Sequence, residues 1–426
     1  MCHKRAACST ILCQQAGIVN ILVRDSFFLN LLRYAISFSV LRNRGVRATK
    51  GKEMAQIHCQ SKQYRDVNIF TFTEMSEDEA HEKFVEVRWG DRNSVTCPCC
   101  GAIGSHYYIA SRKKWRCKDC SEFFSVTSST ILEGRKLTFR IILVALFLFV
   151  AAPKSDGANR IHPILGVTLR TVYMLFGKFR EALWEQRDTS QLTGVVHIDG
   201  GHFCGKPRRP RVRQKANAKA IDSKLRNRKA NLIPTDALKR IEPWNQEKLE
   251  NRRIVLVMRE VSADKRIGGL RTRIAIVPAE TRAHVIQAIR TYVSSDATMV
   301  ITDFSAAYRS LSSWYEHEAV NHSVEYSTDD GVNQNQAESF MARMRRSEFG
   351  ILHGMRPQYL ALYANEFAWR EDVRFCTLGE KFHMLLSMIL RTGLSKAWRG
   401  YNQGHRLEVE YDGIPKAEAW PWEETI

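Results

Sequence analysis

The most constraining feature of the chain is a set of three carboxylates, each placed at the end or the start of an expected element. The β-branched run Val195–Ile198 ends in Asp199 and glycines follow at once, which predicts a buried strand with Asp199 at its C-terminal tip and a sharp turn after it. A second such run ends in Asp303, and a helix over residues 333–344 has Glu338 in its first turns. One such aspartate is commonly only a turn former. Two strand tips and a helix together predict a divalent-metal site for phosphoryl transfer.

The order of the elements around these carboxylates predicts an α/β fold. After the Asp199 strand we expect strands at 253–261 and 270–277, a helix at 281–293, a strand at 298–303, a short helix at 306–311, a strand at 318–322 and the Glu338 helix. This βββ-α-β-α-β-α order is that of the ribonuclease H-like fold, a mixed sheet flanked by helices. The first and fourth strands of that fold are neighbours, so Asp199 and Asp303 are expected to meet.

The three carboxylates suit catalysis by two Mg²⁺ or Mn²⁺ ions roughly 3.5–4 Å apart. Asp199 would bridge the ions, while Asp303 and Glu338 would bind one each. Arg345 follows Glu338 by seven residues, which is two helical turns, so it shares that face and could hold a DNA phosphate. Each residue also has a plainer role open to it: Asp303 could cap a helix beginning near Ser305, and Glu338 could be a solvated acid.

The charge of the chain points to a polyanionic partner. Among 426 residues the formal net charge is +19, which favours nucleic acid. Basic residues are concentrated after Asp199 in a segment whose single acid is Asp222. They are Lys206, Arg208, Arg209, Arg211, Arg213, Lys215, Lys219, Lys224, Arg226, Arg228 and Lys229. The segment has no apolar period, so it is expected to be a loop, either an arm on the DNA backbone or a solvated disordered insertion.

Four of the eleven cysteines have the spacing of a zinc ribbon. Cys97 and Cys100 form one CxxC pair, Cys117 and Cys120 form another, and sixteen residues separate the pairs. Two such knuckles complete a tetrahedron of thiolates, which leaves the zinc structural; the alternative is two chance redox or buried pairs. Cys99 is expected to be a bystander. The basic hairpin between the pairs includes Lys113, Lys114 and Arg116, which could contact DNA phosphates.

The segments on either side of the ribbon are expected to be helical. Residues 76–90 form a short helix with Ser76 and Glu79 as a capping box. The apolar run from Ile141 is too short for a bilayer span, which needs roughly 20 residues, and predicts a buried helix instead. Residues 156–186 resemble a helix-turn-helix with its turn at Gly166, which allows either DNA reading or an ordinary helical hairpin.

These patterns divide the chain into five parts. We expect a poorly defined extension at 1–75, a zinc ribbon at 76–132, a helical DNA-binding region at 133–190, a catalytic domain at 191–375 with a basic insertion at 204–253, and a helical tail at 376–426 whose end, 393–426, is loosely packed. Residues 1–53 lack a clear period, so Met54 or Met75 is a candidate natural start. The uneven cysteine spacing indicates a reducing, cytoplasmic compartment.

Several segments together resemble the DDE transposases of bacterial insertion sequences, in the group with an N-terminal zinc ribbon and a ribonuclease H-like core. They are the four-cysteine ribbon, Trp115–Cys117, Phe123–Val126, Ser129–Leu132, Asn321–Ser323, Asn335–Glu338, Phe349–His353 and Tyr363–Arg370. The resemblance implies the catalytic triad Asp199, Asp303 and Glu338, cleavage at element ends and strand transfer into target DNA. It also implies at least a dimer when two element ends are joined. One departure is Gly200, where members often carry an acid.

Two other functions remain open at this stage. The same fold serves metal-dependent nucleases and resolvases. A zinc ribbon with a helix-turn-helix on a degenerate core would be a DNA-binding protein without catalysis. The intact carboxylates disfavour this last alternative.

Overall fold

The structure is a computed structural model, and it describes residues 58, 61–104, 106–204, 251–264, 267–320, 335–407 and 410–413. The extension before residue 58 lies outside these ranges. So does the basic insertion after residue 204, including Arg208, Arg209 and Arg211, and so does the tail after residue 413.

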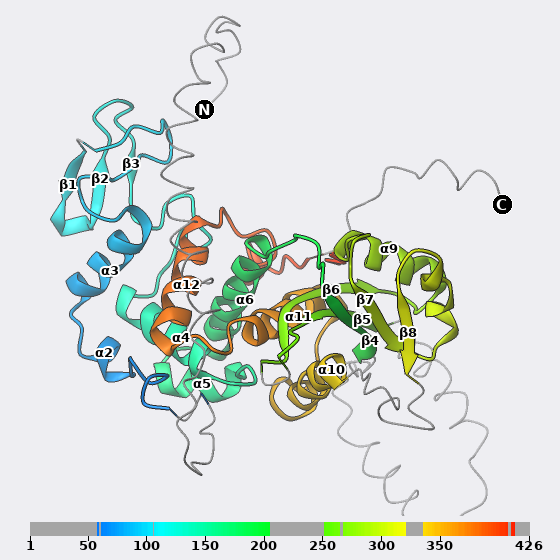
Figure 1. Ribbon diagram of the computed structural model, residues 1–426. Helices are drawn as coiled ribbons and strands as arrows, with labels where there is room; N and C mark the ends of the chain where they lie inside the picture. Colours follow the sequence, from blue (N-terminus) through cyan, green and yellow to red (C-terminus); the bar gives the residue numbers. More distant parts are fainter. Residues whose placement is uncertain are drawn as a thin grey trace, which may run out of the picture. The chain divides into compact units, whose positions relative to one another are not determined.

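The largest sheet that the structure describes is mixed and five-stranded, with the order β6-β5-β4-β7-β8 (Figure 1). Its strands are β4 (Val195–Cys204), β5 (Arg252–Val261), β6 (Gly269–Val277), β7 (Met299–Asp303) and β8 (His317–Val320). The first three form an antiparallel meander, and β7 and β8 add in parallel to β4. The predicted ribonuclease H-like order, with the first and fourth strands adjacent, is therefore confirmed.

The prediction of a sharp turn directly after Asp199 is wrong. Strand β4 continues through Gly200 and Gly201 to Cys204, so Asp199 lies in the middle of the strand and not at its tip. The reason is the equally long neighbour β5, which offers a ladder partner to every residue from Val195 to Cys204. Glycines that would otherwise break a strand are held extended by these partners.

Alternation of side chains along the strands gives the sheet two different apolar faces. Phe203, Val255 and Val257 face helices α10 (Asn335–Ser347) and α11 (Pro357–Asp372). Val196, Ile198 and the alternate residues of β5 face α9 (Arg282–Tyr292) and the 3₁₀ segment η3 (Ala306–Ser313). Each face is thus buried by its own helices, as the continuous apolar runs of the central strands require.

A helical region precedes the sheet in the chain. It contains α4 (Phe139–Ala151), α5 (Ala158–Leu165) and α6 (Leu169–Glu185), and α12 (Leu378–Arg391) joins it from the C-terminal side. Helix α6 contacts α5, α11 and α12, which explains why its second half is buried almost completely. Thr168 caps α6 as predicted, by accepting a hydrogen bond from the backbone of Thr171. None of the described helices has the length and apolar character needed to cross a bilayer.

Burial of α6 corrects part of the helix-turn-helix prediction. Arg180, one of its basic residues, is 3% exposed and cannot face DNA. Its Nε donates to Glu366 Oε2 on α11 at 2.6 Å, and Arg370 binds the other oxygen of the same carboxylate at 2.7 Å. The basic residue left exposed on α6 near its start is Arg170, which donates to the Tyr401 carbonyl.

The expectation of a loosely packed end after residue 393 is also wrong for the part that the structure describes. Trp398 is 2% exposed and stacks on Tyr359 with ring centroids 4.7 Å apart. Further on, the Asp412 carbonyl accepts a hydrogen bond from Ile276 on the edge strand β6. This segment therefore covers a sheet edge that would otherwise be open. Two short helical segments remain: η4 (Glu348–Leu352), a π-helix that follows α10, and η5 (Tyr401–Gln403), a 3₁₀-helix.

The N-terminal part is a small three-stranded sheet packed on a helix. Strands β1 (Tyr107–Ile109), β2 (Lys114–Arg116) and β3 (Phe123–Phe124) are antiparallel, with the turn η2 (Ala110–Arg112) between the first two. Helices α2 (Phe70–Thr73) and α3 (Glu77–Trp89) precede them, and the predicted Ser76–Glu79 capping box is present. Trp115 packs against His81 and Trp89 of α3, so the ribbon and this helix share one core.

Candidate active site and metal centres

The two aspartates belong to neighbouring parallel strands and face the same way. In the ladder, Val195 pairs with Met299 and His197 with Ile301. The same offset continued by two residues sets Asp199 opposite Asp303, and parallel neighbours lie about 4.8 Å apart. Alternation from Ile198 and Val300, which face α9, turns both carboxylates to the α10 side.

Glu338 reaches this face because α10 lies directly on β4. A Cβ atom at Gly201 would lie 2.6 Å from Met341 Sδ and 2.8 Å from the Phe203 ring, so a larger residue would force these side chains to move. Glu338 precedes Met341 by three residues, which places both on one side of α10. The close approach at Gly201 therefore sets the distance between Glu338 and the aspartates.

The pKa of Asp199 shows that the three carboxylates act on one another. Burial raises the pKa of Asp199 to about 6, and the charges of Asp303 and, less strongly, Glu338 push it in the same direction. Arg345 opposes the rise, together with a backbone hydrogen bond from Gly200. A buried acid with acidic neighbours and one nearby cation is an environment that favours a bound metal cation.

The three carboxylates form an open set rather than a single cage. Within the described ranges, the group of three or more candidate ligands whose donor atoms all lie within 4.8 Å is the cysteine cluster alone. A two-ion site does not need all three acids that close. With ions about 3.5–4 Å apart and oxygens about 2 Å from each, the outer ligands on different ions can be roughly 8 Å apart. Carboxylate oxygens are hard donors of the kind that Mg²⁺ and Mn²⁺ accept.

A buried arginine that the sequence did not single out holds the start of α10. Arg259 on β5 is 1% exposed, and its Nη1 donates to the carbonyl of Gln336 at 3.0 Å. The Gln336 side chain in turn accepts from the backbone of Gly269 at 3.2 Å. These bonds anchor the helix two residues before Glu338. An arginine within an otherwise apolar strand was the available signal in the sequence.

A second unanticipated contact crosses under β4 on the opposite face. The Tyr308 hydroxyl donates to Glu280 Oε1 at 2.6 Å, and the same oxygen would lie 2.6 Å from a Cβ atom at Gly200. Burial and Glu280 raise the pKa of Tyr308, and the charges of Asp303 and Asp199 add to the effect. The contact thus joins the segments that follow β6 and β7 directly beneath the aspartates. It also places the Glu280 carboxylate next to Gly200.

Arg345, His197 and His202 lie near the carboxylates and differ in how far they are exposed. Arg345 is exposed on α10 and acts electrostatically on both Asp199 and His202. His197 is buried, while His202 is exposed and its pKa is lowered, first by partial desolvation and then by Arg252. Arg345 is therefore the cation whose charge reaches the carboxylates from an exposed position.

The four predicted zinc ligands come together. Cys97 Sγ lies 3.7 Å from Cys120 Sγ, Cys100 Sγ lies 3.5 Å from Cys117 Sγ, and all four sulfurs lie within 4.8 Å of one another. Backbone hydrogen bonding from Cys120 lowers the pKa of Cys117 to about 6, which favours its thiolate, whereas burial and the neighbouring thiols raise the pKa values of Cys100 and Cys120. Cys99 is exposed and outside the cluster, as expected.

The basic hairpin of the ribbon is only partly available to DNA. Lys113 forms an ion pair with Asp78 of α3, so the prediction that it contacts phosphate competes with a structural role. Lys114 and Arg116 are exposed on β2. Contact of these two residues with DNA phosphates stays a prediction.

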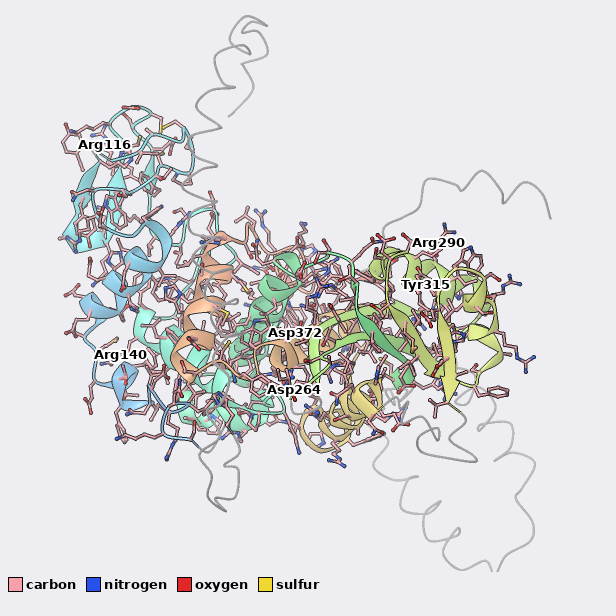
Figure 2. All side chains as sticks on the ribbon, viewed as in Figure 1. Arg116, Arg140, Asp264, Arg290, Tyr315 and Asp372 are labelled. Atoms are coloured by element: carbon pink, nitrogen blue, oxygen red, sulfur yellow. The ribbon has the colours of Figure 1, made fainter. Side chains whose placement is uncertain are left out.

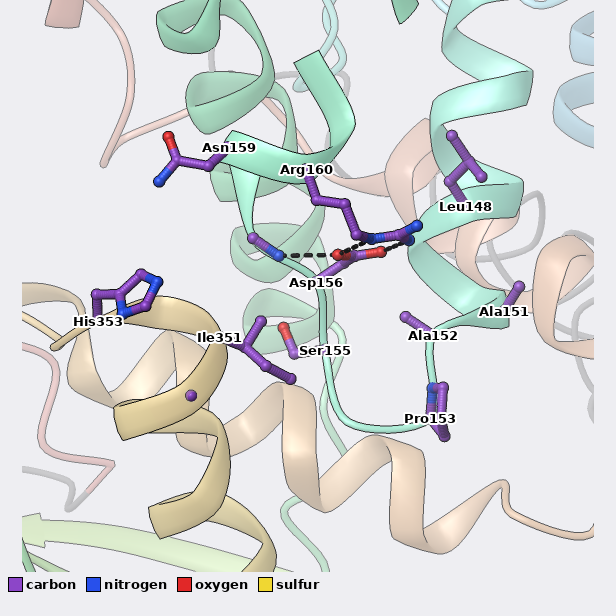
Figure 3. A pocket seen from close by; sticks show the side chains of 12 residues that line it. Leu148, Ala151, Ala152, Pro153, Ser155, Asp156, Asn159, Arg160, Ile351 and His353 are labelled. Carbon is purple, nitrogen blue, oxygen red and sulfur yellow. Dashed lines mark hydrogen bonds and ion pairs between the residues drawn. The ribbon is translucent and has the colours of Figure 1, made fainter. Parts of the chain in front are cut away.

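The pocket of about 530 Å³ shown in Figure 3 lies away from the carboxylates. It is lined by residues around α4, α5 and η4, and the Asp156–Arg160 ion pair forms part of its wall. Neither aspartate nor Glu338 lines it. The carboxylates are thus not part of this pocket.

Fold and sites together define a class. A ribonuclease H-like sheet with acids on neighbouring strands, joined to a four-cysteine zinc ribbon, is the architecture of an enzyme acting on DNA. The family model of the ISXO2-like transposase domain matches residues 191–372, and that of the transposase zinc-ribbon domain matches residues 75–122. The two matches together cover more than half of the chain. No curated protein and no solved structure matches it. The chain belongs to the insertion-sequence transposases that carry an N-terminal zinc ribbon.

Proposed function

We propose that the protein cleaves DNA at the ends of its insertion sequence and transfers the strands to target DNA, with Asp199, Asp303 and Glu338 as metal ligands. The proposal rests on the parallel pairing of β4 with β7, whose register, continued by two residues, sets Asp199 opposite Asp303. The raised pKa of Asp199 supports it, because both other acids contribute to the rise.

Each residue has a separate task in this scheme. Asp199 would serve as the ligand common to two Mg²⁺ or Mn²⁺ ions, and Asp303 and Glu338 would each hold one of them. When bound, the ions supply activation of the attacking oxygen and stabilisation of the leaving 3′ oxygen. Arg345 holds a phosphate of the DNA strand beside the acids. Ion binding keeps Asp199 ionised at a pH where its raised pKa would otherwise favour partial protonation.

Binding to DNA rests on charge outside the catalytic centre. The net charge of +19 supplies general attraction, and Lys114 and Arg116 present exposed cations on the ribbon. The basic segment containing Arg208, Arg209 and Arg211 adds contacts to the backbone. Joining two element ends requires two active sites, so we propose a homo-oligomer assembled on DNA in the bacterial cytoplasm.

The test is a strand-transfer assay with supercoiled target plasmid and DNA carrying the element ends. Asp199→Asn, Asp303→Asn and Glu338→Gln should each abolish cleavage and transfer. Asp296→Asn is the matched control, because this acid is exposed and lies just before β7. Wild-type activity of the Asp199→Asn variant would refute the assignment, while cleavage without transfer would indicate a nuclease of the same fold.

A change of metal preference tests direct ligation. Asp303→Cys and Glu338→Cys replace a hard oxygen by a softer thiolate, which disfavours Mg²⁺ more than Mn²⁺. Activity lost in Mg²⁺ and partly recovered in Mn²⁺ is expected of a ligand. Equal loss in both metals would indicate that the residue acts in some other way.

A further inference from the structure

The zinc ribbon exposes a row of aromatic and basic side chains on its outer face. The sheet registers place Tyr107 opposite Arg116 and Arg116 opposite Phe123, and residues directly opposite in an antiparallel sheet project to the same side. Tyr107 is 61% exposed and Phe123 is 53% exposed. Figure 2 labels Arg116 on the ribbon. We call Tyr107, Arg116 and Phe123 the outer row.

The inner face of the same sheet shows that aromatic residues of the ribbon can also be buried. There Tyr108 lies opposite Trp115 and Trp115 opposite Phe124, and Trp115 is 2% exposed under α3. Aromatic rings in this small domain are therefore buried where a core is available. The outer row also contains two aromatic rings, those of Tyr107 and Phe123, and no described helix or strand buries them. Its rings are available to a partner.

Cations beside the rings define the chemistry of that partner. Arg116 lies 5.8 Å from the centre of the Phe123 ring, and the Lys118 ammonium lies 5.2 Å from that of Tyr107. Lys114 is exposed on the same strand as Arg116, two residues away and thus on the same face. A flat aromatic surface bordered by cations fits a nucleic acid, whose bases stack and whose phosphates are negative.

We propose that the outer row binds unpaired bases of single-stranded DNA by stacking on Tyr107 and Phe123, with Arg116 holding the adjoining phosphate. The bases must be unpaired, because in a duplex neighbouring base pairs cover each base face. The proposal rests on DNA being the substrate in the proposed function. It adds that the ribbon binds a locally melted strand, such as one beside the cleavage site, and is not only a duplex-binding module.

The test compares binding of the full-length protein to a labelled single strand, to its duplex and to a duplex with an internal unpaired loop. Stacking on an aromatic side chain is worth about 5- to 150-fold in affinity per base. Tyr107→Ala/Phe123→Ala should therefore weaken single-strand and loop binding at least fivefold, with less than twofold loss on duplex. The conservative pair Tyr107→Phe/Phe123→Tyr should restore binding. Ile103→Ala is the matched control, since Ile103 is 65% exposed on the ribbon outside the row.

Two further readouts separate stacking from general attraction. A 2-aminopurine base in the single strand should be quenched by wild type and less by the double alanine variant. The slope of affinity against salt should be unchanged in that variant and shallower in Arg116→Ala, because only the arginine neutralises a phosphate. Zinc content measured on each variant shows that the ribbon remains folded.

The outcomes are distinct. The stacking proposal would be overturned if the double alanine variant lost the same affinity for single strand and duplex, or if Ile103→Ala lost as much affinity as that variant. It would also be overturned if the double alanine variant lost no affinity at all, and the outer row would then be assigned to packing against another protein segment. Asp199→Asn should bind the single strand like wild type while failing to cleave. If the stacking test fails but wild type still cleaves DNA in a metal-dependent way, the proposed function holds and only this inference is refuted.

Discussion

Replacing Asp199 by asparagine should make the protein more stable while removing its activity. Folding raises the pKa of this carboxyl from 3.8 to about 6, first through burial and then through Asp303. Keeping the group ionised in the folded state at neutral pH therefore costs about 3 kcal/mol, at 1.36 kcal/mol for each tenfold change in proton affinity. Asparagine has a similar shape and never ionises, so Asp199→Asn should gain about 2–3 kcal/mol at pH 8.

The sign of the effect gives it a characteristic pH dependence. Well below pH 3.8 the Asp199 carboxyl is protonated in both the folded and the unfolded chain, so the variant should have no advantage there, and at pH 4 only about 0.5 kcal/mol of it should be present. As the pH rises through about 6 the folded wild type must ionise a group that the unfolded chain ionises more easily, and the advantage should develop fully. The gain is thus present at high pH and absent at low pH.

Thermal or urea unfolding at pH 4 and pH 8 measures this difference. The buffer is freed of divalent metal by resin treatment, without a chelator that would strip the structural zinc. For a unit of 150–250 residues, 1 kcal/mol corresponds to about 2–4 °C in Tm. Adding Mg²⁺ at about 100 times its Kd should stabilise wild type by about 2.7 kcal/mol and the variant by much less.

Two results would refute the reasoning behind this prediction. An unchanged or lower stability of Asp199→Asn at pH 8 would mean that burial and the charge of Asp303 do not raise the pKa of Asp199 in the folded protein. The same gain at pH 4 and pH 8 would assign it to something other than ionisation. Asp296→Asn, a change at an exposed acid, should have no effect at either pH.

Three other perturbations have expected outcomes. Gly201→Ala should push α10 away from β4 and reduce strand transfer. Adding Met341→Ala removes the sulfur that would lie 2.6 Å from the new Cβ atom, so the double variant should recover part of the strand-transfer activity. No recovery would contradict the contact between residue 201 and Met341. Cys117→Ser should lose bound zinc and expose the ribbon to protease while the sheet still unfolds cooperatively, as followed by zinc release and limited proteolysis. Glu366→Gln should lower the free energy of unfolding by about 3–5 kcal/mol in urea titrations, because it leaves the buried Arg180 without its carboxylate.

The sequence by itself determined the local features of this protein. Spacing alone identified the four zinc ligands, because a CxxC knuckle depends only on neighbours in the chain. Period and punctuation likewise predicted the Ser76 capping box, the strands β5 and β6 and the helix α9 nearly to the residue. The order of these elements was enough to place β4 beside β7, since few topologies accommodate it.

Only the tertiary structure decided what the neighbours of each residue are. The glycines after Asp199 looked like a turn, but a long partner strand keeps them extended and α10 uses the space at Gly201. Arg180 lies on a helix for which the sequence left DNA reading open, yet it is buried against Glu366. The roles of Arg259 and Glu280 follow from contacts with residues 77 and 28 positions away in the chain. Local pattern specifies which element a residue joins, but burial and pairing arise from segments that meet only after folding, and no local pattern encodes them.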